Sequence, residues 1–156
     1  MQPRTVAAAA AAVVVALTAT GCNIFTPQAT LIEYDPSDGV SGKTGTVEFH
    51  NATLIGEPEG DALNLSVTFT NAGEATVVEV RYDDQAQQIR VPEGVTTYGF
   101  PDQQLVFESG DDLTFGSLQN VSFQADGAEP TGVNVQAIST EFVGYETLGP
   151  VEPAAG

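Results

Sequence analysis

Apolar and polar residues alternate along much of the chain, with the period of a β-strand that has one buried face and one face in water. The pattern is clearest in ALNLSVTFTN, residues 62–71. The side chains that it predicts to face the core are Leu63, Leu65, Val67 and Phe69. Those that it predicts to face solvent are Asn64, Ser66, Thr68 and Thr70.

Two neighbouring stretches show the same alternation. TVEFHNATLI, residues 46–55, changes phase in its middle. Its apolar positions are first Val47 and Phe49, and then Ala52 and Leu54. A change of phase inside a strand is typical of a β-bulge, which we expect near Asn51. TVVEVRY, residues 76–82, predicts a further strand without such a break.

Shorter alternating stretches predict the remaining strands. They cover residues 88–91, 96–100, 105–108, 120–125 and 132–138. Turns rich in Gly, Pro and Asp separate them about every 8–12 residues, which is typical of a β-sandwich. We therefore predict an all-β protein with a single immunoglobulin-like or cupredoxin-like sandwich of about 7–8 antiparallel strands.

The N-terminal residues have the three parts of a secretory signal peptide. A basic start with Arg4 is followed by the apolar run VAAAAAAVVVAL at 6–17 and by small residues. The apolar run is shorter than the about 20 residues that a membrane-spanning helix needs. The next residues, ATGC, resemble the lipobox of bacterial lipoproteins and end in Cys22. We expect cleavage between Gly21 and Cys22, and attachment of acyl chains such as palmitate to the Cys22 sulfur.

These features divide the chain into four parts. A signal peptide, residues 1–21, precedes a lipidated N-terminus and flexible tether at 22–45, where Pro and Gly are frequent. The sandwich domain is expected at 46–146, and a disordered tail rich in Pro, Gly and Ala at 147–156. The lipid would hold the domain at the outer face of the cytoplasmic membrane.

The chain is strongly acidic, with 21 Asp and Glu residues against 4 Lys and Arg and a formal net charge of −17. Only Lys43, Arg81 and Arg90 provide positive charge after the signal peptide. Nucleic acid is excluded as a partner, because binding to phosphates needs clustered Lys and Arg. Two interpretations remain open: a self-repelling, solubilising surface, or a negative face that steers a cationic partner.

Candidate metal ligands are few. The pairs Asp83-Asp84 and Asp111-Asp112, together with Asp102, fall in predicted loops, where carboxylates could hold Ca²⁺ if the loops converge. Without the spacing of a known calcium loop they can equally be solvated turn residues. His50 is the single histidine, and strand alternation predicts it on the outward face. We expect no cofactor.

Enzymatic activity is not expected. No G-x-S-x-G motif occurs, the single cysteine is assigned to lipid, and no pair of carboxylates stands out by its spacing. GKT at 42–44 lacks the upstream glycine, the preceding strand and the following helix of a phosphate-binding loop. An enzyme with an unrecognised carboxylate pair stays open as an alternative.

The order of motifs resembles small actinobacterial lipoproteins of the LpqE type. The motifs are DGV at 38–40, GTVEFHNATLI at 45–55, ALNLSVTFTNAG at 62–73, GVNVQAI at 132–138 and GYETLGP at 144–150. The domain of these lipoproteins is similar to the β-sandwich of the periplasmic copper chaperones called PCu(A)C. Those chaperones hold Cu(I) through Met and His side chains. After removal of Met1 this chain has no Met and one His, so the resemblance transfers no ligand.

The resemblance implies a cell-surface domain that binds or supports another protein, with respiratory complexes of the membrane as one candidate. We therefore expect a non-enzymatic, membrane-anchored accessory or scaffold module with a membrane-associated protein partner. The alternative is a lipoprotein that binds a metal, Ca²⁺ or copper, or a small solute. Fold-level analogy alone does not decide between them.

Overall fold

The computed structural model describes residues 39–100, 103–110 and 113–151. These segments form nine strands. They are β1 (Val40–Thr44), β2 (Val47–Gly56), β3 (Ala62–Asn71), β4 (Thr76–Tyr82), β5 (Gln85–Val91), β6 (Gly94–Tyr98), β7 (Val106–Glu108), β8 (Leu118–Ala125) and β9 (Thr131–Ser139). The described segments hold no apolar helix of the length that crossing a membrane requires.

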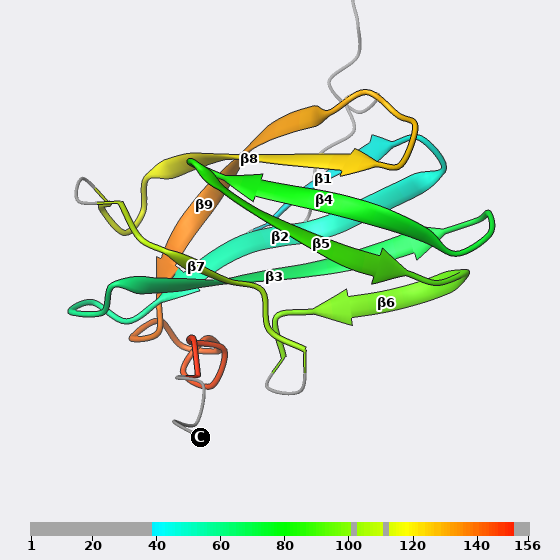
Figure 1. Cartoon of the computed structure of the whole chain (residues 1–156). Helices are drawn as coiled ribbons and strands as arrows, with labels where there is room; N and C mark the ends of the chain where they lie inside the picture. The colour runs from blue at the N-terminus through cyan, green and yellow to red at the C-terminus, as the bar shows by residue number, and fades with distance from the viewer. Residues whose placement is uncertain (1–38, 101–102, 111–112, 152–156) are drawn as a thin grey trace, which may run out of the picture. The chain divides into compact units, whose positions relative to one another are not determined.

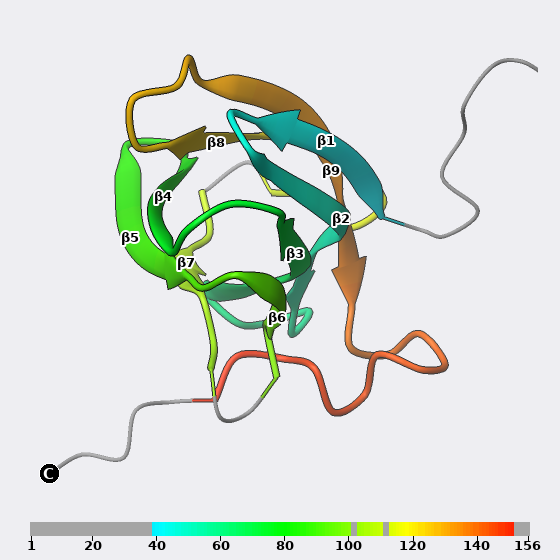
Figure 2. The same ribbon diagram turned by 90° about the vertical axis from the view of Figure 1, so that its right-hand side faces the viewer.

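The strands form two packed sheets that join along one side into a nearly closed ring, which Figure 2 shows end-on. The hydrogen-bonded order is β5-β4-β8-β9-β2-β3-β6, with β1 added to β2 and β7 added to β3 (Figure 1). The predicted all-β sandwich is therefore confirmed. The strands β3 and β4 have the predicted bounds, because their alternation runs without interruption from end to end.

One strand pairing differs from the antiparallel arrangement that the sequence predicts. Leu54, Ile55 and Gly56 of β2 lie beside Ala137, Ile138 and Ser139 of β9 in parallel. The first part of β9 instead pairs antiparallel with β8. Because β9 serves both sheets in this way, it closes one side of the sandwich without a further turn.

The core lies between the two sheets and is dominated by aromatic and branched side chains. Phe49 of β2 stacks on Phe123 of β8, with ring centroids 4.1 Å apart. Phe69 of β3 meets the same ring edge-on at 5.9 Å. All four side chains that alternation assigns to the core in β3 are buried: Leu63, Leu65, Val67 and Phe69. Such burial is the main favourable contribution to folding in a domain without disulfides.

The bulge expected in β2 is present. The pairing of β2 with β3 shifts between His50 and Thr53, and Asn51 has a φ of 54°. Asn tolerates this left-handed conformation better than most residues because its short polar side chain can hydrogen-bond locally. The bulge explains the phase change, since it turns both Phe49 and Ala52 into the core.

The structure differs from the expected flexible tether at residues 22–45, because the strand β1 lies inside this range. It pairs with β2 from Val40 to Thr44. Gly42 lies against the Phe49 ring so closely that an added Cβ would stand 2.3 Å from Cζ. The buried Thr44 hydroxyl accepts a hydrogen bond of 3.0 Å from the Ala125 amide. Contacts with distant residues thus order a segment whose Gly-rich sequence has no strand pattern.

The C-terminal segment also differs from expectation, since part of the supposed disordered tail 147–156 packs on the sandwich. Residues 148–151, which we call the C-terminal strap, are held by Gln104. Its Nε2 donates to the Gly149 carbonyl at 3.0 Å, and its Oε1 accepts from the Val151 amide at 2.8 Å. Residues 152–156 lie outside the described residues.

Asn64 was predicted to face solvent but is fully buried. Its Nδ2 donates to the carbonyl oxygens of Gly99 at 2.7 Å and Leu148 at 2.8 Å. Its Oδ1 accepts from the Leu105 amide at 3.3 Å. The polar face of β3 is therefore covered at this end by three segments that the Asn64 amide links together.

The side of the ring opposite β9 is closed by side chains instead of a backbone ladder. Gln85 of β5 donates through Nε2 to the Glu108 carbonyl of β7 at 3.0 Å and accepts from the Glu108 amide at 2.8 Å. Gln87 donates in the same way to the Val106 carbonyl. These amides satisfy the free edge of the short strand β7, which lies on β3 beside Leu63.

Candidate functional site

Five of the residues that the sequence singles out lie outside the described residues: Gly21, Cys22, Asp102, Asp111 and Asp112. Cleavage and lipidation at Cys22 therefore stay predictions. The same holds for any calcium site that uses Asp111 or Asp112.

Asp83 and Asp84 occupy the exposed turn between β4 and β5, as predicted. Asp83 has a φ of 52°, and its Oδ2 would lie 4.0 Å from a Cβ placed on Gly110. The Asp83 side chain thus lies close to Gly110. Within the described part of the chain, however, no three His, Cys, Asp or Glu side chains are grouped as a metal site requires.

His50 lies half-buried on the outer face of β2, opposite Thr68 of β3. Its neighbour on this face, Glu48, forms an ion pair of 3.1 Å with Lys43 of β1. The expected outward orientation of His50 is consistent with the burial of Val47 and Phe49 on the opposite face. The surroundings of His50 in the described residues thus offer hydroxyls and a paired carboxylate.

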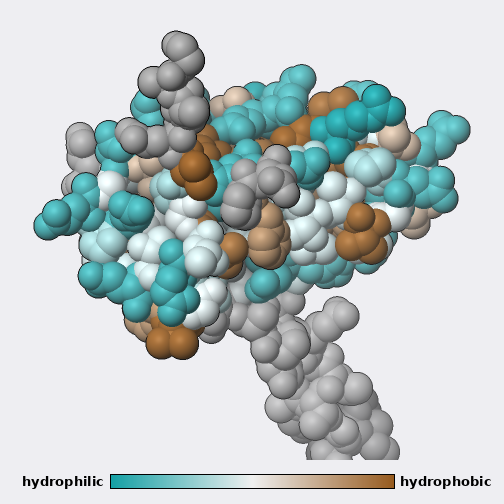
Figure 3. Space-filling view, turned by 90° about the horizontal axis from the view of Figure 1, so that it is seen from below, coloured by the Kyte–Doolittle hydropathy of each residue, from teal (hydrophilic) through white to brown (hydrophobic). Residues whose placement is uncertain are grey.

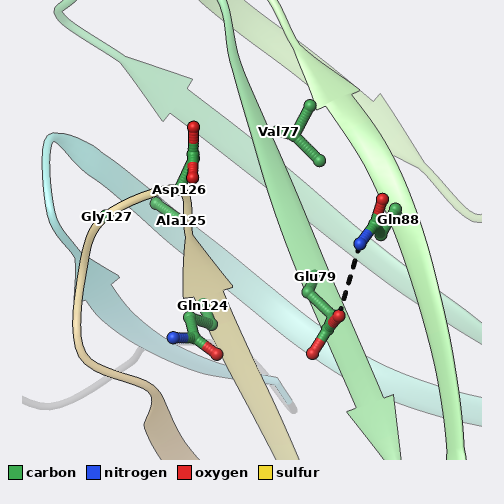
Figure 4. A pocket seen from close by; sticks show the side chains of 7 residues that line it. All are labelled: Val77, Glu79, Gln88, Gln124, Ala125, Asp126 and Gly127. Atoms are coloured by element: carbon green, nitrogen blue, oxygen red, sulfur yellow. Dashed lines mark hydrogen bonds between the residues drawn. The ribbon is translucent and has the colours of Figure 1, made fainter.

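A first surface hollow, of about 340 Å³, lies on the outer face of β4, β5 and β8 (Figure 4). Glu79 and Gln88 point toward one another there and are joined by a hydrogen bond of 3.4 Å. Glu79 also accepts a shorter bond of 2.6 Å from Arg81. These bonds, that of Arg81 above all, lower the pKa of the Glu79 carboxyl. Its charge is already satisfied, so this hollow has the character of an ordinary polar sheet surface.

A second hollow, of about 700 Å³, lies beside Tyr82 and Gly110. Burial raises the pKa of the Tyr82 hydroxyl, and the charge of Asp83 adds to this rise. The Tyr82 ring packs edge-on against Phe107 in the core, with centroids 5.9 Å apart. The tyrosine thus serves mainly as a core residue whose hydroxyl reaches the surface.

The most distinctive surface is the end of the sandwich where β2 and β9 terminate. We call it the acidic end, and it comprises residues 57–61 and 140–151. The parallel pairing of the two strands ends at Gly56 and Ser139, and the Thr140 amide then donates to the Gly56 carbonyl at 2.9 Å. The β2–β3 turn, residues 57–61, and the C-terminal segment, residues 140–151, are therefore brought side by side, although they are far apart in sequence.

The segment 140–151 presents an apolar tip. Phe142 is 66% exposed and Val143 is 92% exposed. The tip is nevertheless ordered by hydrogen bonds on both sides: the Phe142 amide donates to the Ser139 carbonyl at 3.1 Å, and the Tyr145 amide to the Phe142 carbonyl at 3.0 Å. A segment whose backbone is already ordered loses less conformational freedom on binding than a flexible one.

A third hollow, of about 540 Å³, runs between the β2–β3 turn and the C-terminal strap, and we call it the acidic groove. Its lining residues are Glu57, Gly60, Asp61, Ala62, Val106, Pro150 and Val151. The apolar side chains come from β3, β7 and the strap, and the carboxylates come from the turn. Figure 3 views the molecule from below, and its apolar side chains lie there in separate patches among polar ones.

The acidic end has no positive charge of its own. Its carboxylates are those of Glu57, Glu59, Asp61, Glu141 and Glu146, and neither segment contains Lys or Arg. Sequence reasoning considered a negative face but did not locate it here. The available signal was EFVGYE at 141–146, in which two large apolar residues stand beside glycine between acidic ones.

Comparison with known proteins identifies the fold. No family model and no curated protein matches the sequence. The structure is similar to the apo PCuAC domain from PmoF2, with a TM-score of 0.53, 11% identity, and coverage of 66% of this chain and 98% of that one. It is also similar to the apo PCuAC domain from PmoF1, with a TM-score of 0.52, 12% identity, and coverage of 64% and 99%.

A copper-bound PCuAC domain from PmoF2 is similar as well, with a TM-score of 0.50, 12% identity, and coverage of 64% and 98%. The chain thus has a PCuAC-like fold, as the sequence resemblance implied. Its described residues do not fit a Cu(I) site of soft ligands, because they include His50 but neither Met nor Cys. The resemblance to LpqE-type lipoproteins stays a prediction.

Proposed function

We propose that this protein is a non-enzymatic, lipid-anchored accessory module that binds a membrane-associated protein at the outer face of the cytoplasmic membrane. The anchor would be Cys22, after cleavage behind Gly21. Tethering to the membrane raises the effective concentration of the domain for other membrane proteins, so that a modest intrinsic affinity suffices.

The observation that carries the proposal is the exposed and ordered tip formed by Phe142 and Val143. Binding energy in protein interfaces is concentrated in a few side chains, among which aromatic ones are prominent. Large apolar side chains on an ordered loop are suited to this role, because the backbone that carries them does not have to be ordered on binding.

The charge of the acidic end supports a cationic partner. The carboxylates around the tip, such as Glu141 and Glu146, lie in segments without any Lys or Arg. Complementary charge increases the rate of encounter and suppresses wrong partners, and added salt weakens both effects. The partner surface is therefore expected to carry an apolar cleft bordered by Lys and Arg.

The test is capture from detergent-solubilised membranes through a C-terminal affinity tag on a Gly/Ser linker. The full chain is compared with a variant carrying Phe142→Ser and Val143→Ser. The matched control carries Val95→Ser and Leu118→Ser, which remove apolar side chains that are 71% and 65% exposed on β6 and β8.

We expect one membrane protein to be retained by the wild-type chain and by the control, and to be lost from the tip variant. Circular dichroism shows whether all three proteins are folded, as the exposure of the substituted side chains predicts. Equal capture by the tip variant, or no specific capture by the wild-type chain, refutes the proposal.

A further inference from the structure

We infer that the acidic groove is the receiving site for a lysine or arginine side chain of the partner protein. The inference rests on the proposed function and deepens it. The tip would insert into the partner, while the groove beside it would accept a side chain from the partner, so that the contact is reciprocal.

The chemistry of the groove matches a long cationic side chain better than a bare cation. Its apolar surface comes from Ala62, Val106, Pro150 and Val151. Lys and Arg side chains characteristically lay their aliphatic stems along such a surface while the charged head reaches a polar rim. The carboxylates of Glu57 and Asp61, on the adjacent turn, provide that rim.

The rim carboxylates are not neutralised by cations of the described residues. The ion pairs of this part of the chain are Lys43–Glu48 and Arg81–Glu79, and both involve other strands. A divalent cation is disfavoured as the occupant, because the described residues hold no group of three acidic or other metal-ligating side chains. A single charged head needs only one or two carboxylates within its reach, and Glu57 and Asp61 both line the groove.

The groove is preformed on both walls. The turn is closed by the Gly60 amide, which donates to the Glu57 carbonyl at 3.0 Å. Gln104 holds the opposite wall through its paired bonds to Gly149 and Val151. A site whose walls are fixed before binding pays little ordering entropy, and the gain from charge and stem contacts is then available for affinity.

A partner-independent experiment uses two blocked tetrapeptides of alternating leucine with either arginine or its neutral isostere citrulline. Each is titrated into the full chain in detergent micelles at low salt, and the backbone amide shifts are followed by NMR. Saturable shifts are expected at Gly60, Ala62 and Val151 with the arginine peptide, and much smaller shifts with the citrulline peptide.

Charge variants then locate the site. In a variant with Glu57→Gln and Asp61→Gln we expect affinity for the arginine peptide to fall about 3- to 10-fold, as for the loss of two exposed ion pairs. A control with Glu74→Gln and Glu93→Gln has the same net charge, but its changes lie in turns at the opposite end of β3, where affinity should stay near the wild-type value. Equal affinities of the two variants, or equal shifts with both peptides, overturn the inference.

The membrane capture experiment separates this inference from the proposed function. The variant with Glu57→Gln and Asp61→Gln is compared with the wild-type chain at the same salt concentration. If both retain the partner equally well, the assignment of the groove is wrong and the protein-binding role stands. If the wild-type chain captures no specific partner, the proposed function fails, whatever the peptides show.

Discussion

Replacement of Asn64 by leucine tests whether the buried amide is the link that holds the acidic end together. In the native protein this side chain makes three hydrogen bonds to backbone groups of three different segments. Leucine has a similar size but neither donates nor accepts. Asn64→Leu therefore leaves two buried groups, the Gly99 carbonyl and the Leu105 amide, without their hydrogen-bond partner. The Leu148 carbonyl also loses its partner, but at a partly exposed position.

The expected loss follows from the two buried groups. A buried backbone group deprived of its partner costs about 1–3 kcal/mol, so the loss of two lowers the free energy of unfolding by about 2–6 kcal/mol, because the edge carbonyl is free to bond water. For a domain of this size, that loss lowers Tm by about 8–24 °C. Such a change is a large part of the about 5–15 kcal/mol that stabilises an ordinary domain.

Thermal and urea unfolding followed by circular dichroism measure the effect. Thr68→Val is the matched control, because Thr68 lies on the same face of β3 and makes a hydroxyl bond of 3.2 Å to Thr97 at a partly exposed position. It should cost about 1 kcal/mol or less. If Asn64→Leu unfolds within about 0.5 kcal/mol of the wild-type protein, the linking role assigned to Asn64 is wrong.

Three further outcomes are expected. Gly42→Ala should destabilise the domain by about 1–3 kcal/mol in urea unfolding, because its Cβ would overlap the Phe49 ring; unchanged stability would mean that β1 is not packed as described. An NMR titration should place the pKa of the Glu79 carboxyl below its usual range. The stabilising contribution of this carboxylate is then fully present above the unfolded-state pKa and is lost as pH falls through the folded-state pKa. Arg81→Gln should return the pKa of Glu79 toward normal, and an unmoved pKa contradicts the assigned cause. Cys22→Ser should release the protein from membranes, and an unmodified thiol in the mass spectrum of the membrane-bound wild-type chain contradicts lipid anchoring.

The acidic character of the candidate site was predictable from the sequence, but its location in the fold was not. An acidic surface follows from composition alone, since 21 acidic residues face 4 basic ones. The convergence of 57–61 with 140–151 does not, because it depends on the parallel pairing of β2 with β9. The Asp83 turn is a similar case. Its exposure was predictable from the sequence, but its position close to Gly110 was not.

The sequence by itself determined the features that depend on local pattern. Two-residue alternation is read within a single strand, so β3 and β4 were predicted with their observed bounds, and the phase change in β2 located the bulge at Asn51. Only the tertiary structure decided what depends on distant partners. Gly42 can lie in β1 against the Phe49 ring because glycine has no side chain that would overlap it. Asn64 is buried because three remote segments form hydrogen bonds with its amide. Contacts of this kind leave no periodic trace, since their partners are brought together by the fold and not by spacing along the chain.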